Sequence, residues 1–502
     1  MHPDSQPKAE AKPIPTEDQS ATLVWTPGPG SRATCQVGRK IGAGGFAEVF
    51  EAELRMPRGA GSGKSTGKLT GESIDPPPRR VALKRLLPGM RGDPLRQRQL
   101  RREAQIASAL NHPNIVKVLS LIELGDEVAL AMELVEGVQC NHLLHRLAQR
   151  GQRLRIESIA HITAGLFAAL KYLENPLGAS RPLVHADISL ENLMLTTAGD
   201  VKLIDFGIAA ENLSAAAAAP QPEEALTSLH QAAGKRPYLP PEGMSARGPS
   251  SQSDLYAAGV CFWELCTGRR FPVLPRGIGD RELGSLISFA AEGLPEPAWR
   301  LLLSCLALDR DARLRMAGEG LELCQRLGER AEVAAAMGSL VQAVMGMGSA
   351  ATGGKLPPEA EATVEPYDFF ASIVQRVQGA FCAENVLAMA PVGEDPSGTL
   401  ADMSGQPDSS QSGAGSLTFA LRASYGSTSG PSLLDAVPPA ALLREALDTG
   451  FVESPDGALL FRVRPPGPGE RASVVCIQPG RSCSYDAMAQ TILRNLLAPN
   501  IR

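Results

Sequence analysis

Short runs of alternating apolar and polar residues occupy the first third of the chain, a pattern typical of β-strands. The runs that fit strands are 35–41, 48–54, 81–87, 115–124 and 127–134. Residues 95–110 have apolar side chains at helical spacing instead, and Gly125-Asp126 marks a hairpin turn. This part of the sequence therefore predicts a small β-rich lobe with one helix.

Beyond Gly137 the apolar spacing becomes mostly helical. Residues 156–174, 253–268 and 297–314 fit long, buried helices. From about residue 350 helical and strand-like runs mix, with a Ser/Gly/Pro/Asp-rich linker at 393–415. The order predicts a large helical lobe followed by a further α+β module of no type that the sequence identifies.

Composition shifts set the expected domain boundaries. Gly, Ser, Thr and Pro are dense in 55–80, which indicates a flexible insertion. The expected parts are a disordered leader at 1–34, a small lobe at 35–136, a large lobe at 137–330, a helix and linker at 331–360, and the C-terminal module at 361–502.

Charge and cysteine usage exclude several classes of function. At 502 residues and a net charge of −5, the chain offers no general electrostatic case for binding nucleic acid or an anionic membrane. Residues 333–352 carry no charge, but they are rich in Ala and Gly, so we expect a helix that runs into a linker and not a membrane span. The nine cysteines are scattered without a CxxC pair, which favours reduced thiols in a cytoplasmic protein.

Two glycine-rich stretches compete as the phosphate-binding loop. GAGSGKST, residues 59–66, resembles a Walker loop, but Arg58 stands where the first glycine belongs, and three prolines at 76–78 preclude the helix that must follow. GAGGFAEV, residues 42–49, lies between two predicted strands, where a hairpin can fold over phosphates. The second stretch is the better candidate because of the residues that accompany it.

Those residues follow in a recognisable order. Lys84 lies in VALK on the next strand, and Glu103 lies on the following helix, where it can pair with the lysine. Asp187 and Asn192 come from VHADISLENLML, and Asp205 comes from VKLIDFGIA. Oxygen ligands from two adjacent segments suit Mg²⁺, which binds few protein groups and keeps phosphate oxygens and waters.

Together with PPE at 240–242, these motifs resemble those of the eukaryotic-type serine/threonine protein kinases found in bacteria (Hanks-type kinases), over residues 35–330. The resemblance implies an α+β, bilobal protein-kinase fold. It also implies a cytoplasmic signalling enzyme that transfers the γ-phosphoryl group of ATP, with Mg²⁺ or Mn²⁺, to a Ser or Thr hydroxyl of a protein and phosphorylates itself. Oligomeric state stays open.

The resemblance assigns a role to each matching residue. Asp187 would accept or orient the substrate proton, Lys84 and Glu103 would orient the phosphates, and Asn192 and Asp205 would hold the metal. The residues expected around ATP are Ile41, Gly42, Ala43, Gly44, Gly45, Phe46, Val49, Ala82, Lys84, Met132, Glu133, Val135 and Leu195. The structural residues are Glu242, expected to pair with Arg313, and Asp254, expected to brace the catalytic loop.

Several positions depart from the family pattern. Ala186 replaces the arginine that usually clamps a phosphorylated activation loop, so we expect activity without phosphorylation of Thr227 or Ser228. Ser189 replaces a catalytic-loop lysine, Ala47 replaces the third glycine, and Lys235 replaces a threonine typical of Ser/Thr kinases. The alternative is a pseudokinase or scaffold that binds nucleotide or partners without efficient transfer, but Lys84, Asp187 and Asp205 are all retained.

Overall fold

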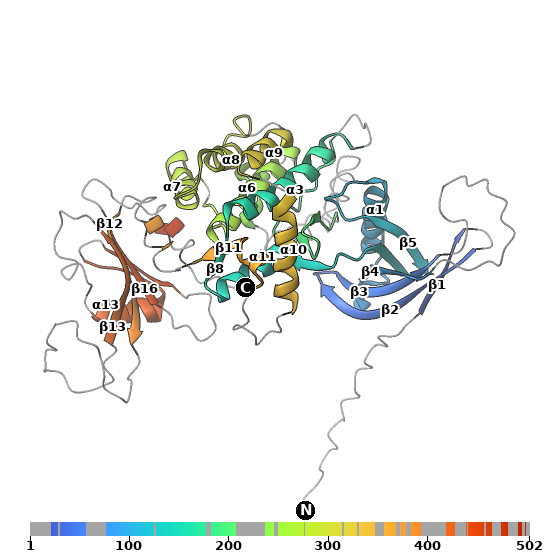
Figure 1. The fold of residues 1–502 in the computed structure, drawn as a ribbon, viewed down its shortest axis with the longest axis horizontal. Helices are drawn as coiled ribbons and strands as arrows, with labels where there is room; N and C mark the ends of the chain where they lie inside the picture. Colours follow the sequence, from blue (N-terminus) through green and yellow to red (C-terminus); the bar gives the residue numbers. More distant parts are fainter. Residues whose placement is uncertain are drawn as a thin grey trace, which may run out of the picture. The chain divides into compact units, whose positions relative to one another are not determined.

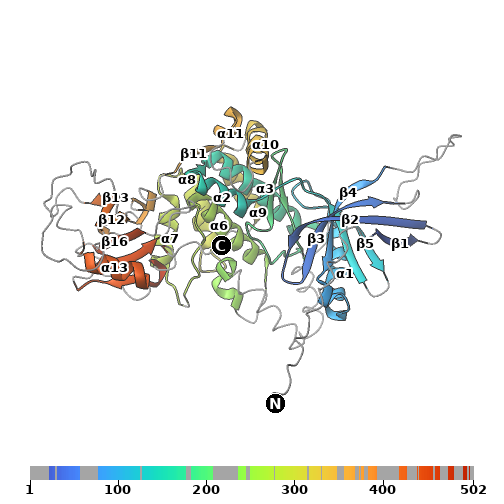
Figure 2. The same ribbon diagram turned by 90° about the horizontal axis from the view of Figure 1, so that it is seen from below.

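A computed structural model describes most of the predicted elements. The described residues are 22–28, 31–56, 77–124, 127–176, 182–206, 236–244, 249–275, 277–313, 316–328, 331–346, 356–367, 372–373, 375–377, 383–392, 418–426, 438, 440–455, 458–463, 473–479, 490–493 and 497. They fall into two compact units. One comprises Met1–Ala109 and Lys117–Leu134, and the other comprises Leu110–Val116 and Val135–Arg502 (Figures 1 and 2).

The first unit is an antiparallel sheet with one helix. Its strands are β1 (Thr22–Gly28), β2 (Ser31–Ala43), β3 (Ala47–Arg55), β4 (Arg79–Leu86), β5 (Val118–Leu124) and β6 (Glu127–Glu133), in the spatial order β1-β2-β3-β4-β6-β5. A short 3-10 turn (η1, Pro88–Met90) leads from β4 to helix α1 (Pro94–Ala109), which packs on β5 and β6. The sheet and helix predicted from the apolar pattern are therefore present.

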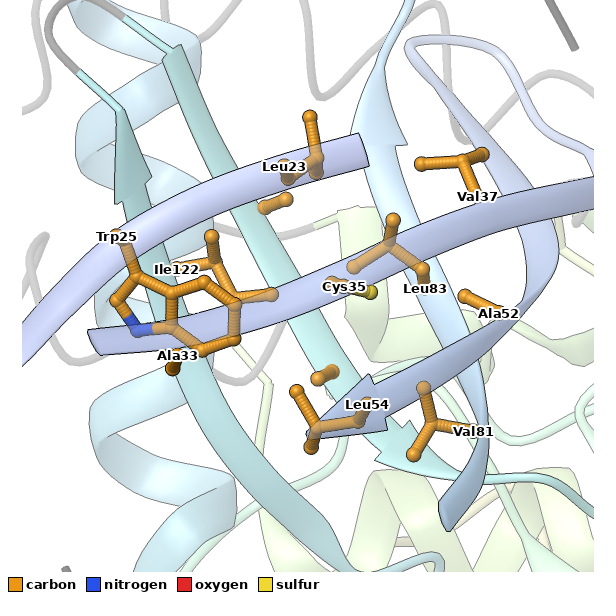
Figure 3. Close-up of a cluster of buried hydrophobic side chains, with 12 residues drawn as sticks. Leu23, Trp25, Ala33, Cys35, Val37, Ala52, Leu54, Val81, Leu83 and Ile122 are labelled. Atoms are coloured by element: carbon orange, nitrogen blue, oxygen red, sulfur yellow. The ribbon is translucent and has the colours of Figure 1, made fainter. Parts of the chain in front are cut away.

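The expectation of a disordered leader through residue 34 is wrong for residues 22–28 and 31–34. Strand β1 pairs with β2 and also contacts β5, the strand at the opposite edge of the sheet. Trp25 and Leu23 are buried in a cluster with Cys35 and Ile122, which Figure 3 shows. Burying a tryptophan side chain removes a large apolar area from water, which favours an ordered strand here.

The glycine- and serine-rich insertion joins two paired strands. Leu54, near the end of β3, pairs with Arg79, at the start of β4, so the connection leaves and re-enters the sheet at neighbouring positions. GAGSGKST itself lies outside the described residues, as does 57–76 as a whole. A Walker loop must join a strand to a helix, whereas this connection joins two antiparallel strands.

The second unit begins with a helical body. Its elements are β7 (Gly137–Gln139), α2 (Cys140–Gln149), β8 (Gln152–Leu154), α3 (Ile156–Glu174), β9 (Leu193–Thr196), β10 (Val201–Leu203), η3 (Arg236–Tyr238), η4 (Pro241–Met244), α6 (Ser251–Thr267), α7 (Asp280–Ala291), α8 (Glu296–Leu306) and α9 (Ala317–Arg326). Helix α6 is buried from Asp254 to Thr267. Gly259 allows this helix to approach α8, because an added Cβ would lie 2.5 Å from the Cβ of Cys305.

Residues 331–346 and 356–367 continue this helical body, so the expected module boundary at 361 is wrong. Helix α10 (Ala331–Gly346) packs on α3, β7 and β9, burying Met337, Leu340 and Val341 (Figure 1). After α11 (Pro358–Glu361), strand β11 (Val364–Pro366) pairs antiparallel with β8. Several apolar side chains of the uncharged stretch at 333–352 are therefore explained by packing inside the protein, as far as Val344. None of the helices in the described ranges has the length and apolar character needed to cross a bilayer.

Five strands between residues 383 and 479 form a further antiparallel sheet. Its strands are β12 (Ala383–Val392), β13 (Thr418–Gly426), β14 (Phe451–Glu453), β15 (Leu459–Val463) and β16 (Ser473–Pro479), in the order β13-β12-β16-β15-β14. Helix α13 (Ala440–Thr449) covers one face through Leu443 and Ala446, which pack against Leu460 and Cys476. This arrangement is α+β, as the sequence predicts.

Candidate active site

The glycine-rich hairpin between β2 and β3 is closed by backbone hydrogen bonds. Gly42 pairs with Val49, and the N–H of Gly44 donates to the carbonyl of Ala47 at 2.7 Å. The carbonyl of Phe46 accepts from the N–H of Leu87 at 2.9 Å, so the tip of the hairpin is tied to the chain after β4. The predicted loop is therefore a tight turn in which Gly44 and Gly45 are exposed.

Lys84 and Glu103 form a buried ion pair in the first unit. The Nζ of Lys84 donates to both carboxylate oxygens of Glu103, at 2.8 and 2.9 Å, and the two side chains are 7% and 5% exposed. The ring of Phe46 lies 5.8 Å from the same Nζ. Strand β4 and helix α1 therefore hold the ammonium group in one place beneath the glycine-rich turn.

The residues expected near the adenine base lie on paired strands. In the first unit, Ala82 on β4 pairs with Met132 on β6, and Val49 on β3 pairs with Lys84. Ile41 is 42% exposed on β2. Glu133 and Leu134 end the first unit, and Val135, the next residue along the chain, belongs to the second unit.

In the second unit, the fully buried Leu195 lies on β9, opposite Val138 of β7. The small sheet formed by β7, β9 and β10 is anchored by the preceding segment, since the Asn114 side chain donates to the carbonyl of Val201 at 2.9 Å. The N–H of Leu203 donates to the carbonyl of Asn114 at 2.8 Å.

Asp187 and Asn192 face each other across the loop that precedes β9. The Nδ2 of Asn192 donates to the carboxylate Oδ2 and to the backbone carbonyl of Asp187, both at 2.8 Å. Both side chains are buried, and the backbone N–H of Asn192 donates to the carbonyl of Ser189 at 3.1 Å. These bonds fix the Asp187 carboxylate and occupy the amide nitrogen of Asn192, so the amide oxygen is the group left to serve as a ligand.

Asp254 braces the same loop from the start of α6. Its two carboxylate oxygens accept the backbone N–H groups of His185 at 2.7 Å and Ala186 at 2.8 Å. Ala186 has a φ of 62°, in the left-handed region that L-residues avoid, so the loop is held in a strained conformation. Burial raises the pKa of the Asp254 carboxyl to about 7, although the two donors act in the opposite direction.

Asp205 follows β10 and is connected to this loop through its neighbours. The N–H of Ile204 donates to the carbonyl of Asn192 at 2.9 Å, and the ring of Phe206 contacts His185 with centroids 4.6 Å apart. Asp205 itself has a φ of 66°, a second strained residue in this unit. An amide oxygen and a carboxylate from adjacent segments form a donor set that fits a hard cation such as Mg²⁺.

The ion pair predicted between Glu242, the last residue of the PPE motif, and Arg313 is also present. Glu242 accepts from Nη1 and Nη2 of Arg313, at 2.6 and 3.1 Å, and the Arg313 side chain is completely buried. Burial raises the pKa of the Glu242 carboxyl, but the Arg313 guanidinium outweighs this, and the net pKa is lower than usual. Thr227, Ser228 and Lys235 lie outside the described residues.

Three residues that sequence reasoning did not single out form a further network. Glu264 on α6 accepts from the hydroxyl of Tyr238 at 2.6 Å, and Arg270 lies close to both. The available signal was a carboxylate in the otherwise apolar stretch 253–268.

Ser189, which replaces the family lysine, is buried, and its hydroxyl has no hydrogen-bond partner within the described part of the chain.

Comparison with known proteins agrees with this geometry. The sequence model described as the protein kinase domain matches residues 35–317, just over half of the chain. The chain therefore belongs to the protein kinase domain family. Strand β1 and everything after residue 317 lie outside the matched region.

Curated relatives include bacterial enzymes named as serine/threonine-protein kinases. The probable serine/threonine-protein kinase SCO3848 of Streptomyces coelicolor is 31% identical over 61% of this chain and 42% of its own length. PrkC of Bacillus subtilis is 31% identical over 47% of this chain and 30% of its own length. The chain thus spans less than half the length of these relatives. The solved kinase domain of Mycobacterium tuberculosis PknI, 23% identical, aligns over 59% of this chain and 96% of that domain with a TM-score of 0.39.

Proposed function

We propose that this chain is an ATP-dependent serine/threonine protein kinase that transfers the γ-phosphoryl group to a protein hydroxyl and also phosphorylates itself. The observation that carries the proposal is the arrangement of Asp187, whose carboxylate is held by the Asn192 amide at 2.8 Å on a loop braced by Asp254. A general base must be oriented before it can accept a proton from a hydroxyl. The similarity to bacterial serine/threonine-protein kinases supports the acceptor type.

Each unit contributes one part of the proposed reaction. In the first, the Lys84 ammonium, held by Glu103, would contact the α and β phosphates while the backbone N–H groups of the glycine-rich turn cover them. In the second, the Asp187 carboxylate would accept or orient the proton of the acceptor hydroxyl. Backbone groups of Glu133 and Val135 would bind the adenine edge, and Ala82 and Leu195 would contact its faces.

Asn192 and Asp205 would hold Mg²⁺ or Mn²⁺ through the amide oxygen of one and the carboxylate of the other. The bound cation would neutralise negative charge on the phosphoryl group during transfer. Asn192 is suited to this role because its amide nitrogen already donates twice to Asp187. One side chain thereby links the orientation of the proposed base to the proposed metal position.

Cys35, Cys140, Cys261, Cys266 and Cys305 are buried reduced thiols, which supports a cytoplasmic location, where ATP is also available. The protein substrate would present the hydroxyl of a Ser or Thr side chain. The alternative function, a pseudokinase that binds nucleotide without transfer, lacks an observation in its favour, since Lys84, Asp187 and Asp205 are all in place.

The test is incubation of the purified full chain with γ-labelled ATP and Mg²⁺, alone and with a general protein acceptor. We expect label on the wild type and on the acceptor, and loss of both in Asp187→Ala and Asp205→Ala. Nucleotide-dependent thermal stabilisation without label in any sample would instead identify a pseudokinase.

A further inference from the structure

A charged cluster lies beside the proposed catalytic loop and takes no part in the chemistry described above. The guanidinium of Arg270 reaches Glu191 on the catalytic loop, with Nη1 3.3 Å from Oε1. Its Nε lies 4.0 Å from a carboxylate oxygen of Glu264, and its centre lies 5.5 Å from the ring centroid of Tyr238. One arginine therefore contacts the catalytic loop, helix α6 and the segment that precedes Glu242.

The two carboxylates in this cluster have different surroundings. Glu264 is buried, and its oxygens accept the Tyr238 hydroxyl at 2.6 Å and the N–H of Phe271 at 2.8 Å. Glu191 has a side chain that is 41% exposed, and the Arg270 side chain is 34% exposed. The cluster thus has a buried floor and an open side, and Arg270 supplies the positive charge between them.

The position of Glu191 puts this cluster within reach of an acceptor peptide. The acceptor hydroxyl must come within hydrogen-bonding distance of Asp187. Glu191 is only four residues further along the same loop, at most about 14 Å away even for fully extended backbone. An extended peptide advances roughly 3.4 Å per residue, so side chains two to four residues from the acceptor can reach the open side of the cluster.

We propose that Arg270 determines acceptor specificity by neutralising Glu191 and Glu264 from within the protein. The enzyme would then accept peptides with uncharged side chains two to four residues from the phosphorylated hydroxyl. Without Arg270, the same carboxylates would select a basic side chain at that place. This inference rests on the proposed kinase function, because it assumes that an acceptor binds beside Asp187.

The physical reason is competition for the same carboxylates. A substrate arginine that approached wild-type protein would meet a guanidinium already contacting Glu191, and the like charges would oppose binding. In Arg270→Ala the exposed Glu191 carboxylate and the buried Glu264 carboxylate would lose that cation. A peptide guanidinium could replace it with charge-assisted hydrogen bonds.

The experiment compares peptides that differ only in one residue. Serine peptides carry either alanine or arginine at each position from two to four residues on either side of the acceptor. Binding is measured by calorimetry with the full chain and a non-hydrolysable ATP analogue, and kcat/KM is measured with ATP. The variants are Arg270→Ala, Arg270→Gln, Arg270→Ala/Glu191→Gln and, as a control, Arg300→Ala, which removes an exposed arginine that pairs with Glu296 one turn away on α8.

Wild type and Arg300→Ala should bind alanine peptides at least as tightly as arginine peptides at every position. Arg270→Ala or Arg270→Gln should favour arginine about tenfold at one position at least. Adding Glu191→Gln should remove most of that preference, which a general loosening of the fold would not do. The inference is wrong if both Arg270 variants keep the wild-type ratio, including the case in which neither peptide binds. Peptide binding does not require phosphoryl transfer. If the Arg270 variants favour arginine peptides but no protein sample transfers label, the kinase proposal is wrong and the inference about Arg270 stands.

Discussion

The carboxylate of Asp254 accepts the backbone N–H of Ala186 at 2.8 Å, and Ala186 has a left-handed φ of 62°. The family resemblance places an arginine at position 186, yet the backbone keeps the strained conformation with alanine there. The strain is therefore held by helix α6 through Asp254, and no side chain at position 186 is needed for it. Asp187 is the next residue, so its orientation depends on this bond.

Asp254→Asn should lower kcat about 10–100-fold, because the amide nitrogen would face a buried N–H that now lacks an acceptor, at a cost of about 1–3 kcal/mol. The dissociation constant for ATP should stay within about threefold, since Lys84 and Glu103 are untouched. Steady-state kinetics and nucleotide titration measure the two quantities. Asp280→Asn, on the exposed first turn of α7, is the control. Unchanged kcat in Asp254→Asn would show that the brace is dispensable.

Single and double variants of the Lys84–Glu103 pair should have different effects on stability and on activity. Lys84→Met alone should destabilise the protein by about 3–5 kcal/mol, because Glu103 would be left as a buried, unpaired charge. The double variant Lys84→Met/Glu103→Leu should recover most of that loss while transfer stays abolished. Denaturant unfolding monitored for the first unit, together with label transfer, measures both effects. Recovery of activity in the double variant would contradict the role given to Lys84.

Glu264 makes stability depend on pH in a defined direction. Burial raises the pKa of its carboxyl to about 7, and the negative charge of Glu191 acts in the same direction, whereas hydrogen bonds from Tyr238 and Phe271 and the positive charge of Arg270 lower it. Between the ordinary pKa of 4.5 and about 7, the folded state holds a proton that the unfolded state has lost. The free energy of unfolding should therefore fall as pH rises through that window, by at most about 1.4 kcal/mol per pH unit from this group.

Asp254, whose pKa burial also raises to about 7, contributes a slope of the same sign. Glu264→Gln should flatten the pH dependence without removing it, as urea unfolding at pH 5, 6, 7 and 8 would reveal. A steeper slope in the variant, or none in the wild type, would argue against a raised pKa at Glu264.

Phosphorylation of the activation segment should be unnecessary for activity. Ala186 has no guanidinium with which to clamp a phosphate. Thr227→Ala/Ser228→Ala should keep kcat within about threefold of wild type, with mass spectrometry confirming which sites carry phosphate. A near-total loss of activity would refute this expectation.

The parts of the site that sequence could predict are those in which one motif determines one contact. Lys84 and Glu103, Glu242 and Arg313, and Asp254 with its loop are brought together as expected, because their positions in paired strands and packed helices follow from the order of the motifs. These pairs need no knowledge of the surrounding surface.

Elements outside the motifs were harder to predict. Strand β1 lies in a stretch with Pro27 and Gly28, and only Leu23 and Trp25 signal burial, through contacts with strands far along the chain. Strand β11 is three residues long and pairs with β8 across more than 200 residues. The Arg270 cluster joins three separate segments, so it depends on tertiary packing that no local pattern encodes.

The most direct test of the account compares transfer and nucleotide binding in Asp187→Asn. If Asp187 is the oriented base of a kinase, phosphoryl transfer to a serine peptide should fall at least about 100-fold, while the dissociation constant for ATP with Mg²⁺ stays within about threefold. Asp187→Asn protein that transfers phosphate at the wild-type rate, or wild-type protein that binds ATP without transferring it, would contradict the account.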